Sequence, residues 1–497
     1  MARRFQNYID GKWVDSRSGR TFENRNPANW DEVIGTFPLS NKEDVEAAVK
    51  AARKAYESWR LVPAPKRGDF MRNVGDILTA RKEEIAKQMT REMGKVLLET
   101  RGDVQEGIDT AYYASSEGRR LFGHTVPSEL PSKFNMAIRV PIGVAAIITP
   151  WNFPMAIPTW KIFPALLCGN SVVFKPASDT PATATTLIEI LLEAGIPPGV
   201  VNLVHGGGTE VGIGLVEHPD VDLVSFTGST VVGKRISEIA SKTLKRVSLE
   251  LGGKNAQIVM DDANLDLALE GVLWGAFGTT GQRCTATSRL IVHEKVYDKF
   301  LAMVVQHAQK LRLGDGLKRD VDVGPCVNEK QRQTVDEYVK IGAQEGAKIL
   351  TGGKLAKGDG LSKGWFYEPT VLGDVTPNMR VAREEIFGPV LSVVKVGSLE
   401  EAIAVCNNTA YGLSSSIYTQ DINNAYRAIR DIKAGITYIN SPTIGAEAHM
   451  PFGGVKETGN GHREGGWTVY DFFTEWKTVY VDYSGKLQRA QIDNVEK

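Results

Sequence analysis

Cysteine is scarce in this 497-residue chain, which contains only four. Cys168, Cys284, Cys326 and Cys406 lack the CxxC spacing of redox or zinc motifs, and a chain of this size needs no disulfides for stability. There are also only seven histidines, and we expect no metal site. The sequence therefore predicts reduced thiols and a cytoplasmic protein.

The sequence has no excess of either charge and no long apolar run. Lys+Arg and Asp+Glu each total 59, so we expect neither nucleic acid nor an anionic membrane as a partner. The longest apolar run, at 140–149, stops at Pro150 after about ten residues, which is too short to span a bilayer. No apolar signal core follows Arg3 and Arg4.

Strands and helices alternate through most of the chain, and its length predicts two or three domains. Residues 40–60, 66–94 and 100–122 read as helices, the first with a possible capping box of Ser40 and Glu43. From residue 138 onward, apolar runs alternate with helical stretches. The pattern predicts an α/β fold with two doubly wound parallel sheets, whose ligands bind at the carboxyl ends of strands. The predicted strands are 142–148, 171–174, 200–203, 221–226 and 245–249, then 257–260, 289–292, 389–396 and 435–439.

One cysteine stands in polar surroundings. Cys284 lies in Gly-Gln-Arg-Cys-Thr-Ala (281–286), whereas Cys168 and Cys406 lie in apolar runs typical of core cysteine. A thiolate is the nucleophilic form, and Arg283 could supply part of a field that favours it. The residues alone leave both alternatives open for Cys284, a catalytic thiol or a core residue.

A carboxylate and an amide are candidates to act with this thiol. Glu250 ends a predicted strand in Glu-Leu-Gly-Gly-Lys, where it could activate water, or instead form an ion pair with Lys254. Asn152, in Thr-Pro-Trp-Asn-Phe-Pro, could donate a hydrogen bond to an oxyanion, or serve only as a turn residue.

Phosphate-binding signals are weak. The runs 205–212 and 226–233 each precede a predicted helix, but neither matches G-x-G-x-x-G or carries the Walker lysine. Lys175 directly follows an apolar strand, where it could reach a ribose or phosphate group or remain solvated.

Eight runs together resemble the aldehyde dehydrogenase superfamily over nearly the whole chain. The resemblance implies a Rossmann-like coenzyme domain (1–122 and 142–252), a catalytic domain (253–453) and a small β oligomerisation domain (123–141 and 469–490). It also implies a homo-oligomer, dimer or tetramer. The matching runs are 149–154, 174–178, 226–230, 250–254, 281–284, 384–389, 408–414 and 451–456.

The resemblance assigns roles by position. Cys284 would be the nucleophile, Glu250 the general base, and the Asn152 amide with the Cys284 N–H the oxyanion hole. The cofactor would be NAD or NADP. Strict NAD users often carry Glu where Ser178 stands, so this chain is expected to accept NADP or both cofactors. The implied cofactor-binding residues are Thr149, Pro150, Trp151, Lys175, Ser178, Gly228, Ser229, Gly233, Leu251, Glu385 and Phe387.

The substrate implied by the resemblance is a small aldehyde, oxidised to its acid through a thioester. Arg283 resembles members that act on anionic aldehydes, and the 440–450 loop resembles semialdehyde dehydrogenases of the 2-oxoglutarate semialdehyde type. Non-phosphorylating glyceraldehyde-3-phosphate dehydrogenase is an alternative, although that loop contains no Arg. A nicotinamide-independent thiol hydrolase is another, but no motif ties a His to Cys284. The implied substrate residues are Phe153, Trp160, Arg283, Thr285 and Phe452.

Overall fold

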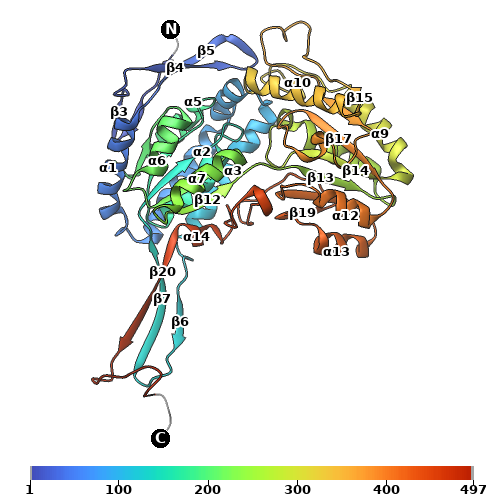
Figure 1. Ribbon diagram of the computed structural model, residues 1–497. Helices are drawn as coiled ribbons and strands as arrows, with labels where there is room; N and C mark the ends of the chain where they lie inside the picture. Colours follow the sequence, from blue (N-terminus) through green and yellow to red (C-terminus); the bar gives the residue numbers. More distant parts are fainter. Residues whose placement is uncertain (1–2, 494–497) are drawn as a thin grey trace.

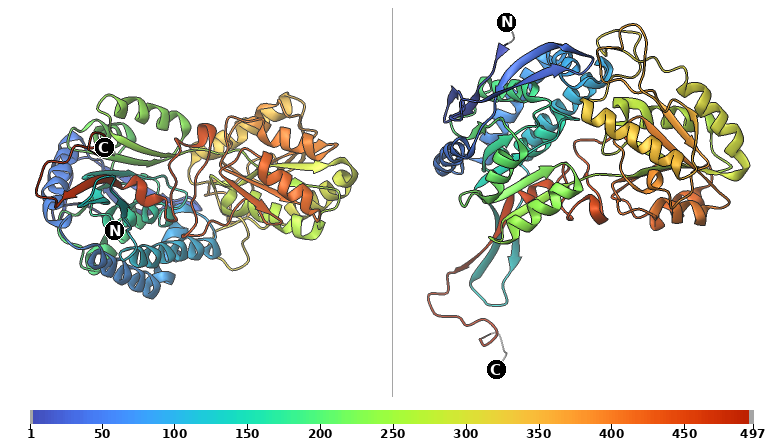
Figure 2. Two further views of the ribbon diagram at one scale, coloured as in Figure 1. Left: turned by 90° about the horizontal axis from the view of Figure 1, so that it is seen from below. Right: turned by 45° about the horizontal axis from the view of Figure 1, so that its top comes forward.

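The computed structural model describes residues 3–493 and consists of two α/β lobes side by side with a projecting three-stranded arm (Figure 1). Two seven-stranded sheets form the centres of the lobes. The predicted fold class is confirmed, and both views of Figure 2 show the lobes separated by a narrow waist. None of the described helices is long and apolar enough to cross a membrane.

The sheet of the first lobe has the order β12-β11-β8-β9-β10-β2-β3. Its first five strands run parallel, and β2 and β3 form a hairpin around Asp10 and Gly11, both of which have positive φ. Because the strand order reverses at β8, the crevice between β8 and β11 is the expected ligand site. The strands are β2 (Asn7–Ile9), β3 (Lys12–Val14), β8 (Val144–Ile148), β9 (Ser171–Lys175), β10 (Val201–Leu203), β11 (Leu223–Thr227) and β12 (Arg246–Glu250).

Alternate side chains of β8 enter two separate cores. Ala145 and Ile147 pack with α2 to α5, and Val144, Ala146 and Ile148 pack with α1, α6 and α7. All five residues are buried, as expected for a parallel strand covered on both faces. The helices are α1 (Lys42–Trp59), α2 (Ala64–Met93), α3 (Leu97–Glu117), α4 (Ala156–Leu167), α5 (Pro181–Glu193), α6 (Ile213–Glu217) and α7 (Thr230–Ser241).

The start of α1 differs from the prediction by one residue. Asn41, not Ser40, is the N-cap, and its side chain accepts from the backbone of Glu43 and Asp44. Asp44 completes the capping box by accepting from the Asn41 N–H at 3.1 Å. Ser40 instead accepts a 2.8 Å hydrogen bond from the Asn7 side chain, so its hydroxyl serves a tertiary contact.

The sheet of the second lobe has the order β15-β16-β17-β14-β13-β18-β19, with only β15 antiparallel. Sequence reasoning missed β15, β16, β18 and α8. Serines occupy much of β18, so it lacks the apolar run that marks a buried strand. The strands are β13 (Asn255–Val259), β14 (Thr287–His293), β15 (Lys348–Thr351), β16 (Thr370–Gly373), β17 (Val390–Val396), β18 (Ser414–Tyr418) and β19 (Ile436–Ile439).

Helices cover both faces of this sheet too. Residues of α8 (Leu265–Phe277) and α9 (Glu294–Ala308) share one core, and residues of α10 (Glu329–Gln344), α12 (Leu399–Asn407) and α13 (Ile422–Asp431) share the other. Two short helices, α11 (Arg380–Arg383) and α14 (Val469–Phe472), lie in connections. Cys326 and Cys406 are buried in the second of these cores, and Cys168 is buried in the first lobe.

The arm is the sheet β20-β7-β6, formed by β6 (His124–Pro127), β7 (Lys133–Pro141) and β20 (Thr474–Asp482). Nine register pairs join β20 to β7, from Thr474 opposite Pro141 to Asp482 opposite Lys133. The arm extends away from both lobes in Figure 1. A second small sheet joins β1 (Arg3–Arg4), β5 (Asn29–Pro38) and β4 (Thr21–Asn26).

The two sheets meet end to end. Glu250 ends β12 of the first sheet, and after a four-residue connection Asn255 begins β13 of the second. Cys284 precedes β14, so it lies at the amino edge of the second sheet. The carboxyl edge of the first sheet therefore faces the amino edge of the second, and the candidate site lies between them.

Candidate active site

A strained turn positions the Cys284 thiol. Thr279 and Thr280 adopt left-handed φ values of 52° and 58°, a conformation that costs free energy and needs support. The Glu99 carboxylate accepts from the Thr279 N–H at 2.6 Å, and the Thr280 hydroxyl donates to the Gly324 carbonyl at 2.9 Å. Beyond the turn, the Asn255 side chain donates to the Cys284 carbonyl at 2.8 Å.

Cys284 lies where two cavities meet, since it lines both. Burial, together with the nearby Glu250 and Glu385 carboxylates, raises the pKa of its thiol to about 12. The backbone N–H groups of Thr285 and Cys284 oppose this shift. The surroundings therefore hold a neutral thiol that must lose its proton during reaction.

The expectation that Arg283 supplies a field for the thiolate is wrong. Its guanidinium donates to Glu99 at 3.1 Å and to the Thr279 hydroxyl at 2.9 Å, and it lies over the Trp274 ring at 4.7 Å. It is not among the groups that shift the Cys284 pKa. Arg283 instead lines one of the two cavities, where it can meet a bound molecule.

Glu250 is buried beside the thiol. Only 4% of its surface is exposed, and its Oε1 has no hydrogen-bond partner in the described chain. The alternative of an ion pair with Lys254 is excluded, because the Lys254 ammonium has no hydrogen-bond partner either. Burial raises the Glu250 pKa well above its usual value, and Glu464 raises it further. Such a carboxyl is a strong proton acceptor once ionised.

A buried ion pair stands next to Glu250. Lys161 donates to the Glu464 carboxylate at 2.6 Å, and both side chains are almost fully buried. The positive charge of Lys161 lowers the Glu250 pKa and so opposes the effects of burial and Glu464. Sequence reasoning missed this pair because its two members are 303 residues apart.

A second buried ion pair fixes the loop that carries Asn152. Lys95 donates to Asp103 at 2.7 Å and to the Asn152 backbone carbonyl at 2.9 Å, and its ammonium lies 3.9 Å from the Phe153 ring centre. The other Asp103 oxygen accepts from the Ala156 N–H at the start of α4. The amide side chain of Asn152 is buried with its oxygen unpartnered, and the residue lines the same cavity as Cys284.

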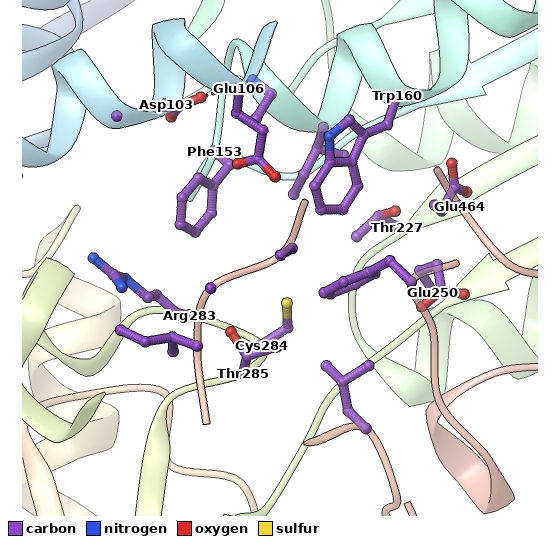
Figure 3. Close-up of a pocket in the computed structure, with 18 of the residues that line it drawn as sticks. Asp103, Glu106, Phe153, Trp160, Thr227, Glu250, Arg283, Cys284, Thr285 and Glu464 are labelled. Carbon is purple, nitrogen blue, oxygen red and sulfur yellow. Dashed lines mark hydrogen bonds between the residues drawn. The ribbon is translucent and has the colours of Figure 1, made fainter. Parts of the chain in front are cut away.

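The first cavity has a volume of about 480 Å³ and mostly apolar walls. Trp160 and Phe452 form one wall with ring centres 4.8 Å apart. Figure 3 shows the Cys284 thiol pointing into this space from below. All five predicted substrate residues line it, namely Phe153, Trp160, Arg283, Thr285 and Phe452, and so do Ile444, Gly445 and Ala446 of the 440–450 loop.

The second cavity continues into a third, and together they form a cleft between the lobes. Their volumes are about 220 and 280 Å³, and they share Pro150, Thr227 and Gly228. Ten of the eleven predicted cofactor residues line this cleft. Gly233 does not, because it packs against Leu251, where an added Cβ would lie 2.5 Å from a methyl group.

The backbone shapes much of the cleft. Ser229 caps the start of α7, so the helix N-terminus opens on the cleft beside Gly228. At the other end, Glu385 accepts from the Gly253 N–H at 2.9 Å. Phe387 adopts a left-handed φ of 58°, and Gln331 donates to its carbonyl at 2.9 Å. An anion suits the N-terminus of α7, and a group with hydroxyl donors suits the carboxylate of Glu385.

Lys175 and Ser178 lie at the far end of the cleft. Burial lowers the Lys175 pKa to about 8, and its ammonium donates to the Pro176 carbonyl at 2.8 Å. The Ser178 hydroxyl donates to the Gly206 carbonyl at 3.3 Å. Lys234, which could have assisted a phosphate group, is exposed and pairs with Glu457 at 2.9 Å.

Residues 13–479 match the model of the aldehyde dehydrogenase family. The chain belongs to this family. It is 44% identical to the alpha-ketoglutaric semialdehyde dehydrogenase of Bacillus subtilis over 96% of this chain and 98% of that one. It is 45% identical to the alpha-ketoglutarate semialdehyde dehydrogenase of Haloferax volcanii, covering 96% and 99%. A betaine aldehyde dehydrogenase of Staphylococcus aureus, solved with NAD+, superimposes with a TM-score of 0.95 at 36% identity, covering 97% and 95%.

The chain is thus an NAD(P)-dependent aldehyde dehydrogenase, which oxidises an aldehyde to its carboxylic acid. The cleft fits the dinucleotide of such an enzyme. The α7 N-terminus suits a pyrophosphate. Glycine is required at position 228 beside it, since a Cβ there would lie 2.5 Å from the Phe226 ring. The carboxylate of Glu385 and the ammonium of Lys175 stand at opposite ends, where each can meet a ribose.

Several residues of this aldehyde dehydrogenase site were missed from the sequence. Glu99, Asp103 and Glu106 all belong to α3 and line the aldehyde cavity. Their spacing places three acids on one face of the helix, which is a readable signal. Lys95, Asn255, Lys161 and Glu464 left no such signal, because each acts through a partner that only the fold brings near.

Proposed function

We propose that this enzyme oxidises the semialdehyde of a 2-oxo dicarboxylic acid, namely 2-oxoglutarate semialdehyde, to the dicarboxylate. The observation that carries the proposal is Arg283. It is the only Lys or Arg on the aldehyde cavity among residues 3–493, and it lies next to the predicted nucleophile. The names of the two semialdehyde dehydrogenase relatives support the same substrate.

The first chemical step is addition of the Cys284 sulfur to the aldehyde carbon. Because the thiol pKa is raised, its proton must pass to a base as the C–S bond forms, and Glu250 is the carboxylate on the cavity that acts most strongly on the thiol. The Asn152 amide and the Cys284 N–H stabilise the oxyanion that forms. A nicotinamide dinucleotide held in the cleft would supply the hydride acceptor for oxidation of this adduct.

The second step is hydrolysis of the Cys284 thioester. Glu250 first releases the proton of the thiol to solvent, and the ionised carboxylate then takes a proton from water as the oxygen of that water attacks the acyl carbon. The C–S bond breaks, the thiolate recovers a proton, and the acid leaves. The Lys161 ammonium favours the ionised form of Glu250, whereas its partner Glu464 opposes ionisation more strongly and keeps the Glu250 pKa raised.

Two alternative functions are less well supported. A phosphorylated aldehyde such as glyceraldehyde 3-phosphate carries about two negative charges, and a single Arg already paired with Glu99 matches them poorly. A thiol hydrolase would need a histidine base, and no histidine in the described chain lines either cavity at Cys284.

For the cofactor, we propose that NADP is accepted as well as NAD. Ser178 itself carries no carboxylate that would repel a 2′-phosphate, and the Asp179 carboxyl on the same cavity accepts a hydrogen bond from Asn328. Lys175 lies on the same cavity and supplies a positive charge. Comparison of kcat/KM for the two cofactors tests this proposal, and a strong preference for NAD would contradict it.

The substrate proposal is tested with an aldehyde panel that pairs acidic semialdehydes with neutral aldehydes of equal length. Arg283→Gln removes the charge but keeps a hydrogen-bond donor for Glu99. We expect it to raise KM for acidic aldehydes about tenfold or more, with little change for neutral ones. Arg283→Lys, which keeps the charge, is the matched control. Equal effects on both aldehyde classes would refute a charge-pairing role.

We also propose a homo-oligomer, dimer or tetramer, assembled through the arm. Phe134, Ile138, Trp476 and Tyr480 on β7 and β20 are all more than one-third exposed, an unusual apolar display for a monomer. Light scattering coupled to size exclusion tests this, and a monomeric mass would contradict it.

We also propose a reducing compartment such as the cytoplasm, because the four cysteines are unpaired and one of them lies at the site. Thiol trapping of the protein in cell fractions tests this localisation.

A further inference from the structure

Four buried polar atoms of residues that line the aldehyde cavity have no hydrogen-bond partner in the described chain. Two belong to the general base and its neighbour, Glu250 Oε1 and Glu464 Oε2, and the mechanism does not use the other two, which are Oε1 of Glu106 on α3 and Nε1 of Trp160 on α4. Trp160 is only 8% exposed, and its ring is held against Phe452. Figure 3 shows the Glu106 carboxyl and the Trp160 indole on the same side of the cavity, opposite the Cys284 thiol.

The neighbouring acids on this cavity are already engaged. Glu99 accepts from Arg283 and from the Thr279 N–H, and Asp103 accepts from Lys95 and the Ala156 N–H. Glu464 pairs with Lys161. Unpartnered buried polar groups are uncommon in proteins and call for an explanation. For Glu106 and Trp160, a bound molecule is the partner that their position on the cavity offers.

Glu106 can act here as a hydrogen-bond donor. Burial, with a further contribution from Asp103, raises its pKa to about 8, so at neutral pH it keeps its proton. The charged and titratable groups that face it are Asp103 and Asp109 on its own helix, Lys95 before that helix, Arg283 in the nucleophile loop and Tyr438 on β19. A protonated carboxyl and an indole N–H are two donors, and together they suit a carbonyl oxygen.

We propose that Glu106 and Trp160 form a subsite that binds the 2-oxo group of the substrate, so that the enzyme selects 2-oxo semialdehydes over plain semialdehydes. The inference rests on the proposed function and makes it more specific. Arg283 meets the terminal carboxylate, Cys284 meets the aldehyde carbon, and the 2-oxo group lies between these two ends of the substrate. Glu106 and Trp160 are thus specificity-determining residues.

Two substrates of equal length isolate this contact. Both 2,5-dioxopentanoate and 5-oxopentanoate carry the aldehyde and the carboxylate, but only the first has the 2-oxo group. A site built around a polar group of its substrate discriminates strongly against the analogue that lacks it. We expect the wild-type kcat/KM to favour the dioxo substrate by about tenfold or more.

Three variants test the residues. Glu106→Leu removes the donor, and Trp160→Phe removes the N–H while keeping an aromatic ring. Each should reduce the ratio of kcat/KM for the dioxo substrate to that for the plain substrate by about fivefold or more. Glu106→Gln is the matched control, because its amide N–H donates at every pH and should preserve most of the ratio. It also keeps the test valid if the Leu variant does not fold.

The ratio of kcat/KM for the dioxo substrate to that for the plain substrate should also depend on pH. A purely structural role of Glu106 would not produce this dependence. Loss of the Glu106 proton removes a donor, so the wild-type ratio should fall as pH rises through about 8. The ratio of the Gln variant should stay flat, since titrations that affect both substrates equally cancel. Equal kcat/KM for the two substrates, or a ratio unchanged in the Leu and Phe variants, would overturn the subsite alone. Oxidation of neither substrate would instead overturn the proposed function.

Discussion

The two spaces that meet at Cys284 are built in different ways. The dinucleotide cleft is shaped by strand ends, a helix N-terminus and glycines such as Gly228 and Gly252. The aldehyde cavity is shaped by side chains, with rings on one side and the acids of α3 on another. Backbone geometry suits a cofactor that never changes, whereas side chains can vary with the substrate. Cofactor binding and substrate specificity thus reside on different parts of the molecule.

Cys284→Ala gives the largest expected effect and distinguishes catalysis in the aldehyde cavity from cofactor binding in the cleft. Without the sulfur no covalent adduct forms, so kcat/KM should fall on the order of 10⁴-fold or more. Cofactor binding, measured by quenching of tryptophan fluorescence, should stay near the wild-type value. Cys406→Ala, in the core of the second lobe, is the control and should keep its activity. Substantial oxidation by the Cys284 variant would contradict the nucleophile assignment.

Glu250→Gln should stop the reaction after the hydride step. We expect steady-state kcat to fall by about 10²–10⁴-fold, with a burst of reduced cofactor and a thioester visible by mass spectrometry. Because the Glu250 pKa is raised, the wild-type kcat should increase with pH as this carboxyl ionises. The variant should lose that dependence. Fast turnover without an accumulated acyl-enzyme would assign the base to another group.

Lys95→Met tests whether the buried ion pair of Lys95 and Asp103 stabilises the aldehyde side of the site. Removing one member of a buried ion pair leaves Asp103 unpaired, which should cost about 3–5 kcal/mol of unfolding free energy. It also frees the loop that carries Asn152, so kcat should decrease in the protein that still folds. Lys87→Met, an exposed lysine on α2, is the matched control. Unchanged denaturant midpoints for both variants would show that the pair contributes nothing to stability.

Ser178→Glu tests the cofactor side and should have the smallest effect. A carboxylate at the adenosine end would repel a 2′-phosphate, so kcat/KM with NADP should fall about tenfold while the value with NAD changes little. Ser178→Ala separates loss of the hydroxyl from gain of the charge. The proposed acceptance of NADP would be wrong if the Glu variant treated both cofactors as the wild type does.

The sequence predicted which residues line the two spaces better than it predicted the contacts that hold them. The family resemblance gave ten of eleven cofactor residues that line the cleft and five of five substrate residues that line the cavity. The roles of Arg283 and Lys161 depend on partners 184 and 303 residues away. No local pattern encodes such contacts. The strand β18 was missed for a related reason. Its serine hydroxyls donate to backbone carbonyls that lie nearby only in the folded chain.

The hydrogen bonds from Thr279 and Arg283 to Glu99 couple the nucleophile to the way in which the lobes are joined. Glu99 belongs to the first lobe, whereas Thr279 and Arg283 belong to the second. Within the second lobe, the turn keeps only the bond from Thr280 to Gly324. A change in the contact between the lobes would therefore loosen the turn before Cys284 and alter the aldehyde cavity at the same time.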